Sequence, residues 1–208
     1  MLLSVIITTY NSEVWLQKVL EGYCNQTESN FELVIADDGS TANTKLIVDT
    51  FSHKFQFPIQ HVWQEDAGFQ KCKILNKAIL KTNSEYLLFT DGDCIPRNDF
   101  VAQHLKYKEE GYFLSGGYFK LPIKTSNLIS LENINNKAYI DDAEMTILNF
   151  YIGYIYIFDI SSTTLNQKLF TIVMFQKQKI QESHILLILL KTLFLVKGEI
   201  VLLVTQKK

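Results

Sequence analysis

Asp91 and Asp93 stand two positions apart, directly after the apolar run of residues 86–89. The run is typical of a buried strand, and the polar residues after it indicate a loop where that strand ends. Side chains two positions apart point to the same side of an extended segment, and Gly92 leaves the backbone between them free to turn. Two converging carboxylates offer the hard oxygen ligands that Mg²⁺ and Mn²⁺ prefer, and such an ion also holds a substrate phosphate. The competing interpretation is a polar turn with two solvated aspartates.

Three other ligand sites are excluded by the same residues and by missing motifs. An EF-hand loop starting at Asp91 would place Pro96 where glycine is needed and Ala102 where the bidentate glutamate belongs. The turn after the first predicted strand lacks the G-x-G-x-x-G pattern of dinucleotide-binding enzymes, and the chain has no G-x-x-x-x-G-K-[ST] phosphate loop. A diphosphate bound here therefore needs a metal ion on the two aspartates, because free carboxylates would repel it.

Apolar runs alternate with segments of helical spacing along the first half of the chain. This alternation indicates βαβ units and predicts an α/β fold with a Rossmann-like, mainly parallel sheet flanked by helices. The first helix is expected to be capped by Asn11 or Ser12 and to run to about residue 23. The expected strands are 2–9, 31–36, 59–63 and 85–90, and the two other expected helices are 44–51 and 68–81.

Polar clusters follow each of the four predicted strands. They are residues 8–11, 37–40, 64–66 and 91–93. The carboxyl ends of parallel strands meet at one edge of a sheet, and ligands bind beyond that edge. The four clusters are therefore expected to form one site.

Composition narrows the class of protein. A chain of 208 residues suits one domain with a sizeable core, and a net charge of −2 gives no reason to expect a nucleic-acid partner. The three cysteines, Cys24, Cys72 and Cys94, are far apart, which favours reduced thiols in the cytoplasm over a disulfide framework. The start of the chain reads as a strand and not as a signal peptide.

Five segments read together resemble a known family. They are SVIITTYN (4–11), IADDGS (35–40), HVWQEDAGFQKCKILNKAI (61–79), FTDGDCIPRNDFV (89–101) and HLKYKEEGYFLSGG (104–117). They are similar to the inverting family 2 glycosyltransferases of the GT-A fold, and within these to bacterial enzymes of surface-polysaccharide and lipopolysaccharide assembly. The resemblance covers about residues 2–120. It implies a nucleotide-sugar-binding GT-A domain at residues 1–120, with a divergent, truncated or out-of-frame segment at 121–208 that leaves the fold incomplete at its C-terminal end.

The resemblance also implies roles for individual residues. Asp38 would accept a hydrogen bond from the uracil or ribose of a UDP-sugar. Asp91 and Asp93 would hold Mn²⁺ or Mg²⁺ or the ribose, with Asp93 the more direct metal ligand. The nucleotide-sugar site as a whole would comprise Thr9, Tyr10, Asp38, Asp66, Asn76 and Asp91.

Several residues near these motifs have two interpretations. Asn76 is either a ligand contact or an amide on a helix face, and Trp63 and Phe69 are either core or sugar-stacking residues. Asp37 is expected to form the turn rather than contact the ligand. Cys94 has no base beside it in the sequence and is interpreted as a small filler.

The function implied is metal-dependent, inverting transfer from a UDP-sugar to a saccharide or glycolipid acceptor. Inverting transfer needs a general base, which the family supplies as an acid about a hundred residues after the D-x-D motif. No residue here matches it, and after Asp159 the only acids are Glu182 and Glu199. The alternative is therefore a non-catalytic nucleotide-sugar-binding remnant that lacks its acceptor side and base.

The composition changes from about residue 145 to residue 208, where Ile, Leu, Phe, Tyr, Lys and Gln dominate. Residues 185–196 are apolar apart from one lysine, which is short for a membrane span. Three interpretations remain: a membrane-associating tail, a reshaped acceptor side, or out-of-frame translation of an AT-rich gene, which the composition favours. The first would make the protein a membrane-surface adaptor, or would place a cytoplasmic enzyme peripherally at the inner face of the cell membrane.

Overall fold

The computed structural model describes residues 2–110, 112–116, 121–136, 176–179 and 204–206. Residues up to 116 and the two short C-terminal segments belong to one compact unit, and residues 121–136 belong to a second. The strands are β1 (Leu3–Thr9), β2 (Phe31–Asp37), β3 (Ile59–Trp63), β4 (Tyr86–Asp91), β5 (Tyr112–Ser115), β6 (Gln176–Lys179) and β7 (Val204–Gln206). The helices are α1 (Glu13–Cys24), α2 (Ala42–Ser52), α3 (Lys71–Ile79), α4 (Phe100–Tyr107), α5 (Ile123–Leu128) and α6 (Leu131–Asn135).

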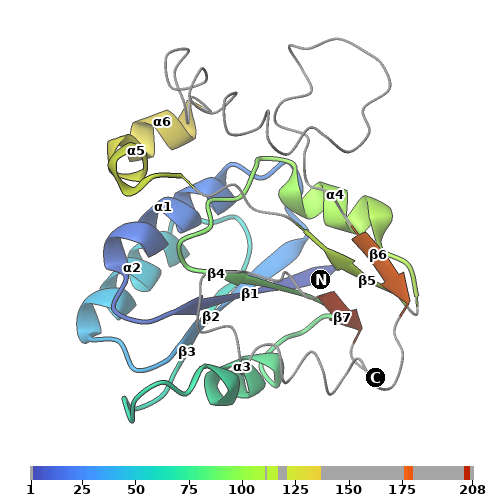
Figure 1. Cartoon of the computed structure of the whole chain (residues 1–208), viewed down its shortest axis with the longest axis horizontal. Helices are drawn as coiled ribbons and strands as arrows, with labels where there is room; N and C mark the ends of the chain where they lie inside the picture. The colour runs from blue at the N-terminus through green and yellow to red at the C-terminus, as the bar shows by residue number, and fades with distance from the viewer. Residues whose placement is uncertain (1, 111, 117–120, 137–175, 180–203, 207–208) are drawn as a thin grey trace. The chain divides into compact units, whose positions relative to one another are not determined.

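The main sheet has the strand order β3-β2-β1-β4-β7 (Figure 1). Its first four strands pair in parallel, and β7 pairs with β4 antiparallel. The register places Thr9 opposite Asp37 and Thr8 opposite Asp91, so the ends of β1, β2 and β4 lie side by side. The predicted α/β class with a mainly parallel sheet is confirmed. A separate antiparallel pair, β5 and β6, forms a second sheet.

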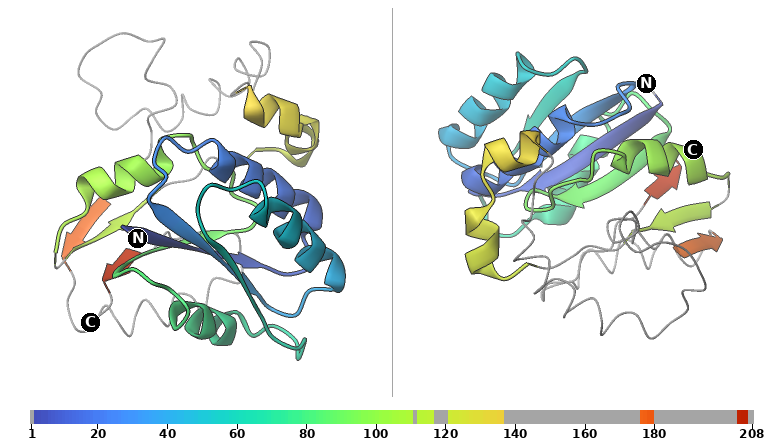
Figure 2. Two further views of the ribbon diagram at one scale, coloured as in Figure 1. Left: turned by 180° about the vertical axis from the view of Figure 1, so that it is seen from behind. Right: turned by 90° about the horizontal axis from the view of Figure 1, so that it is seen from above.

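Helices cover both faces of the main sheet (Figure 2). On one face, Leu3, Val5 and Ile7 of β1 pack with buried side chains of α1, α2 and α4. On the other face, Ile6 of β1 packs with the buried side of α3, which includes Ile74. Both faces of β1 are therefore buried, which explains why its sequence is continuously apolar instead of alternating.

The start of helix α3 and the capping contact of helix α1 differ from the prediction. Helix α3 begins at Lys71 and not at Gly68, which has φ +78° and belongs to the loop after β3. Ser12 occupies the N-cap position of α1, but in the described part of the chain its side chain makes no capping hydrogen bond. The chain instead turns into α1 through Asn11, which adopts a left-handed φ of 44°.

In the second unit, helix α6 begins with a capping box. The Ser130 hydroxyl accepts a hydrogen bond from the Asn133 backbone N–H, and the Asn133 side chain accepts one from the Ser130 backbone N–H. Such reciprocal bonds satisfy two helix-end donors that would otherwise lack partners. The domain boundary expected at residue 120 stays a prediction.

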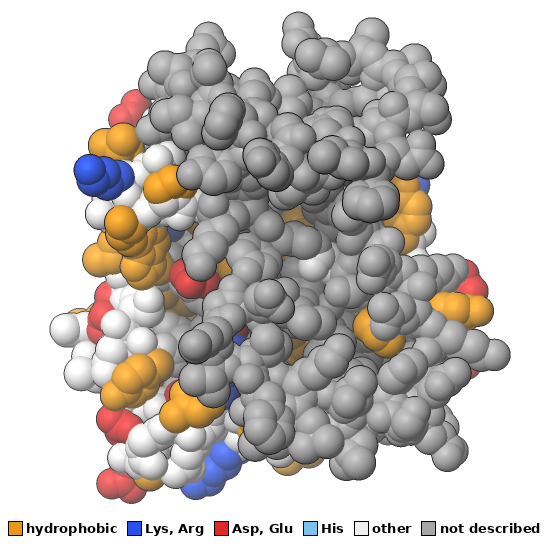
Figure 3. Space-filling view, in the orientation of Figure 1, with side chains coloured by type: hydrophobic (Ala, Val, Ile, Leu, Met, Phe, Trp, Pro, Cys, Tyr) orange, Lys and Arg blue, Asp and Glu red, His pale blue; other side chains and the backbone are white. Residues whose placement is uncertain are grey.

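Glu182, Glu199 and the apolar run 185–196 lie outside the described residues, so the interpretations of that segment stay open. Within the described ranges, none of the helices has both the length and the apolar character needed to cross a bilayer. On the described part of the face in Figure 3, apolar side chains stand in small groups among polar and charged ones.

Candidate nucleotide and metal site

A cavity of about 370 Å³ opens at the carboxyl ends of β1, β2 and β4, beside the first turn of α3. Five residues expected at the site line it together: Thr9, Tyr10, Asp38, Asp91 and Asp93. The complete lining is Thr8, Thr9, Tyr10, Ser12, Ala36, Asp38, Gly68, Phe69, Lys71, Ile74, Asp91, Gly92 and Asp93. Clusters that are far apart in the sequence thus meet at one edge of the sheet, as expected for a parallel α/β fold.

Asp38 is buried and held by three neighbouring segments. Its Oδ1 accepts a hydrogen bond from Gln64 Nε2 at 2.5 Å, and its Oδ2 accepts one from the Gln70 backbone N–H at 2.8 Å. Its own backbone N–H donates to the Thr9 carbonyl oxygen at 3.0 Å. Asp38 therefore connects the ends of β1 and β2 with the loop that precedes α3, and its orientation in the cavity is fixed.

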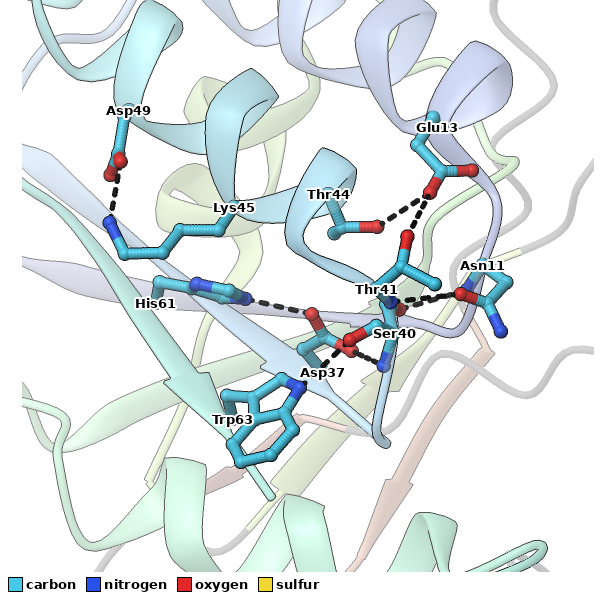
Figure 4. Close-up of polar contacts among 10 residues, drawn as sticks. All are labelled: Asn11, Glu13, Asp37, Ser40, Thr41, Thr44, Lys45, Asp49, His61 and Trp63. Carbon is cyan, nitrogen blue, oxygen red and sulfur yellow. Dashed lines mark hydrogen bonds and ion pairs between the residues drawn. The ribbon is translucent and has the colours of Figure 1, made fainter. Parts of the chain in front are cut away.

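Asp37 is not among the residues that line the cavity, and it holds the turn after β2 (Figure 4). Its Oδ1 accepts the Ser40 backbone N–H at 2.8 Å, and its Oδ2 lies 2.8 Å from His61 Nε2. Burial raises the pKa of this carboxyl, but the hydrogen bonds from His61 and Ser40 outweigh burial and lower the pKa overall. Asp37 therefore forms the turn, as expected, and remains charged inside the protein.

The same turn is held from outside by Trp63 and Asn11 (Figure 4). The Trp63 indole N–H donates to the Ser40 carbonyl oxygen at 3.0 Å, and Asn11 Oδ1 accepts the Thr41 backbone N–H at 3.0 Å. Trp63 is 51% exposed and does not line the cavity, so the structure places it neither in the core nor at a sugar-stacking position within that cavity. Its indole supports the turn that carries Asp38.

Tyr10 and Asp66 meet beside the cavity. The Tyr10 hydroxyl donates to Asp66 Oδ2 at 2.9 Å, and Asp66 Oδ1 accepts the Gly68 backbone N–H at 3.0 Å. The hydrogen bond to Asp66 and the charge of that carboxylate raise the pKa of the Tyr10 hydroxyl. Asp66 thus contacts the cavity lining without being part of it. Phe69 lines the cavity and is 76% exposed, which removes the interpretation that it is a core residue.

The D-x-D loop lies against the end of β1. The Gly92 backbone N–H donates to the Thr8 carbonyl oxygen at 2.8 Å. A Cβ at Gly92 would lie 2.8 Å from that same oxygen, so only glycine permits this close approach. Asp91 Oδ1 accepts the Thr8 hydroxyl at 2.5 Å and the Lys71 ammonium at 2.7 Å. Asp93 is exposed to solvent at the cavity.

The two aspartates fit a divalent ion that the substrate helps to bind. Among the described residues, no group of three or more His, Cys, Asp and Glu side chains is placed to hold a metal ion. Asp91 and Asp93 supply hard carboxylate oxygens to one cavity, and phosphate oxygens and water are the ligands with which Mg²⁺ commonly completes its shell. Their chemistry therefore suits a shared protein–substrate site rather than a closed protein cage.

Two other residues singled out in the sequence, Asn76 and Cys94, have different surroundings. Asn76 lies on α3 with an exposed side chain and is not among the cavity-lining residues, so its role as a ligand contact stays a prediction. Burial, with the charges of Asp93 and Asp91, raises the pKa of the Cys94 thiol to about 12. An un-ionised thiol is a poor nucleophile, which agrees with the interpretation of Cys94 as a small filler.

The segment after the loop is held by α1 and by Gln26, which follows that helix; sequence reasoning did not find these contacts. A Cβ on Gly22 would lie 2.8 Å from Pro96 Cδ, so the helix allows the proline ring to approach its backbone. Gln26 also donates to the Arg97 carbonyl oxygen at 2.5 Å and accepts the Val101 backbone N–H at 3.0 Å. Helix α1 and the segment directly after it therefore fix the direction in which the chain leaves Asp93.

Comparison with known proteins gives a consistent family. The family model described as "Glycosyl transferase family 2" matches residues 4–165, which includes most of the range expected from the motifs and continues beyond it. Chondroitin synthase of Escherichia coli is 30% identical over 150 residues, which is 71% of this chain and 21% of that protein. Validoxylamine A glucosyltransferase of Streptomyces hygroscopicus subsp. limoneus is 35% identical over 106 residues, which is 50% of this chain and 23% of that protein. The chain thus spans about a fifth of the length of these curated relatives.

Among solved structures, TarS of Staphylococcus aureus in complex with UDP is similar, with 27% identity and a TM-score of 0.47. The match covers 54% of this chain and 34% of that one.

Proposed function

Since the chain belongs to glycosyl transferase family 2, we propose that its cavity binds the nucleotide of a UDP-sugar and a divalent metal ion. The sugar would pass with inversion to a saccharide or glycolipid acceptor in cell-surface polysaccharide or lipopolysaccharide synthesis. The observation that carries the proposal is the meeting of Tyr10, Asp38, Asp91 and Asp93 in one cavity at the carboxyl edge of the sheet.

Three lining residues would bind the nucleoside. Asp38 presents fixed carboxylate oxygens, which suit the N–H of uracil or a ribose hydroxyl. The Tyr10 ring is half-exposed at the cavity and offers an apolar surface for a base. Thr9 Oγ1 is buried and has no hydrogen-bond partner in the described part of the chain, so a ligand group would satisfy it.

Asp91 and Asp93 would hold Mn²⁺ or Mg²⁺. When bound, the ion supplies positive charge against the diphosphate of the departing UDP. The protein's own task is to hold both carboxylates on one side of the cavity. The hydrogen bonds of Gly92 and Asp91 to Thr8 do this by fixing the loop on β1.

The state of the cysteines suits the reducing interior of the cell. The three cysteines are all free thiols, and persistent free thiols are typical of the cytoplasm. We place the activity in the cytoplasm or at the inner face of the cell membrane.

The experiment has a binding arm and a turnover arm on the full chain. Calorimetry should show UDP binding with Mn²⁺, and weaker binding of CDP, which lacks the uracil N–H. UDP release from a panel of UDP-sugars should then rise when a cell-envelope acceptor extract is added.

UDP binding with little or no acceptor-dependent release would support the alternative, a non-catalytic nucleotide-sugar-binding remnant. Without a base, transfer loses typically ~10²–10⁴-fold, so weak release is the expected form of that result. A chain that binds no UDP in any condition would remove both functions.

A further inference from the structure

The charges that line the cavity do not suit a diphosphate. Three carboxylates face it, those of Asp38, Asp91 and Asp93. Among the lining residues that the structure describes, the single basic side chain is that of Lys71. An anionic ligand therefore meets repulsion unless Lys71 or an added metal ion offsets it.

Lys71 is already engaged with the D-x-D motif. It is the first residue of α3, and its Nζ lies 2.7 Å from Asp91 Oδ1. Both side chains are partly exposed, Lys71 by 28% and Asp91 by 27%, so the pair lies at the cavity and not in the core. The same oxygen also accepts the Thr8 hydroxyl at 2.5 Å.

We infer that Lys71 is a built-in counter-cation of this site, which pairs with Asp91 when the cavity is empty and with the diphosphate when a metal ion takes Asp91. The inference rests on the proposed function. A divalent ion and an ammonium repel one another, so an ion that binds Asp91 displaces the lysine. The freed ammonium remains on the cavity wall, where its flexible stem lets it reach a phosphate oxygen.

This exchange makes metal and diphosphate binding depend on each other. Metal alone has to break the Lys71–Asp91 pair without a new partner for the lysine. Diphosphate alone takes Lys71 away from Asp91 and leaves that carboxylate unpaired. When both bind, every charge has a partner, so each ligand strengthens the other by the same factor.

A purely structural ion pair is the competing explanation, in which Lys71 holds α3 against β4. A partly exposed pair contributes little to stability, because water screens it and the long side chain loses freedom. The two explanations differ in what removal of the lysine does to metal binding. A structural pair predicts no tighter binding of metal, whereas a competing cation predicts that its removal favours the metal.

The test uses the full chain and three variants. Lys71→Met removes the charge, and Lys71→Gln removes it but keeps a hydrogen-bond donor toward Asp91. Lys77→Met, at an exposed position on the same helix, is the matched control for a lost lysine. Circular dichroism and thermal unfolding check that each variant is folded. Calorimetry then measures Mn²⁺ alone, UDP in EDTA, and UDP with saturating Mn²⁺.

Both Lys71 variants are expected to bind Mn²⁺ alone more tightly than the wild type, by about threefold to tenfold. In EDTA their UDP affinity should fall about tenfold, because a charge-assisted contact is lost. Lys77→Met should match the wild type in both measurements. A wild-type chain with no measurable Mn²⁺ affinity still supports the inference if the Lys71 variants acquire one.

Folded Lys71 variants that bind Mn²⁺ no better than the wild type would overturn the inference. So would a UDP affinity in EDTA that changes no more in Lys71→Gln than in Lys77→Met. In both cases UDP still binds with Mn²⁺, so the proposed function stands. Absence of UDP binding under every condition would overturn the proposed function together with this inference.

Discussion

Gly39 lies directly against the backbone of Asp66: a Cβ added to Gly39 would be 2.6 Å from Asp66 Cα and 2.7 Å from its backbone nitrogen. Gly39 belongs to the turn after β2, and Asp66 belongs to the loop between β3 and α3. The contact therefore fixes the two segments that carry Asp38 and the partner of Tyr10. Glycine is required at this position for two reasons: the close contact leaves no room for a Cβ, and Gly39 has φ +103°.

Replacing Gly39 by alanine should separate these two segments. The new methyl group would overlap backbone atoms, which cannot move aside as a flexible side chain can. We expect Gly39→Ala to lower the free energy of unfolding by about 2–4 kcal/mol and to weaken UDP binding strongly. Guanidinium unfolding and calorimetry measure the two effects.

Gly68→Ala is the matched control. Gly68 also has a positive φ, of 78°, but a Cβ there has no atom within 4 Å. The Gly68→Ala variant should lose only about 1 kcal/mol of its free energy of unfolding, which is the strain of a left-handed backbone. If both variants lose the same stability, the contact between Gly39 and Asp66 is not what fixes the turn.

The metal prediction concerns Asp93. UDP should bind more tightly with Mn²⁺ or Mg²⁺ than in EDTA, and Asp93→Ala should abolish that difference, which is worth on the order of 2–4 kcal/mol. Asp49→Ala, an exposed aspartate on α2, should leave the difference unchanged. Calorimetry measures both. Equal UDP affinity with and without metal in the wild-type chain would take Asp91 and Asp93 out of the metal-binding role.

A further prediction concerns recognition of the base by Asp38. Asp38→Asn keeps the size of the side chain but turns an acceptor oxygen into a donor, which mispairs the uracil N–H at a cost of about 1–3 kcal/mol. Gln64→Leu removes a hydrogen bond that anchors Asp38 but keeps the Asp38 carboxylate that would accept the uracil N–H. The two variants therefore distinguish the anchoring of Asp38 from its recognition of the base.

The measurement is the ratio of UDP to CDP affinity. It should fall in Asp38→Asn and stay near the wild-type ratio in Gln64→Leu, even where the overall affinity drops. Wild-type protein that binds UDP and CDP equally well would show that Asp38 does not read uracil.

The strands and the edge where they meet were predictable from the sequence. Continuous β-branched runs mark buried parallel strands, and the polar residues that follow them collect at the carboxyl edge. The position of Asp38 and Asp91 at this edge was predicted in this way, because strand ends can be read from local sequence. The antiparallel addition of β7 was not predictable, since residues 204–206 only end an apolar run and nothing local shows that they pair with β4.

The remaining features depend on packing between segments that are far apart. Lys71 reads as one of several lysines of a helix, and nothing local shows that it reaches Asp91. Trp63 reads as core or ligand-stacking, whereas its indole N–H supports a turn 23 residues away. Gly68 was expected inside α3, because apolar spacing does not reveal a positive φ. The residue instead belongs to the loop that precedes the helix.

The last prediction concerns a buried carboxylate at the opposite edge of the sheet. Glu32 on β2 is fully buried and accepts hydrogen bonds from the Ser4 hydroxyl at 2.5 Å and from the backbone and side-chain N–H groups of Asn83 at 2.6 and 2.8 Å. Burial raises the pKa of Glu32, but these bonds outweigh it, so that the pKa lies below its ordinary value of 4.5. The charged form is therefore the one that the fold stabilises.

A carboxyl whose pKa is lower in the folded chain stabilises the protein fully above the pKa of the unfolded chain, near 4.5. The contribution is lost as the pH falls from there through the lowered pKa of the folded state. Glu32→Gln should therefore cost about 2–4 kcal/mol at pH 7, where it replaces a charged acceptor of several donors. The difference in stability between the variant and the wild type should narrow steadily below pH 4.5, because the wild type loses the same charge by protonation.

Denaturant unfolding between pH 3 and 7 measures this difference, with Glu85→Gln at an exposed site as the control. Parallel stability curves for wild type and Glu32→Gln would show that the carboxylate's charge does not stabilise the fold.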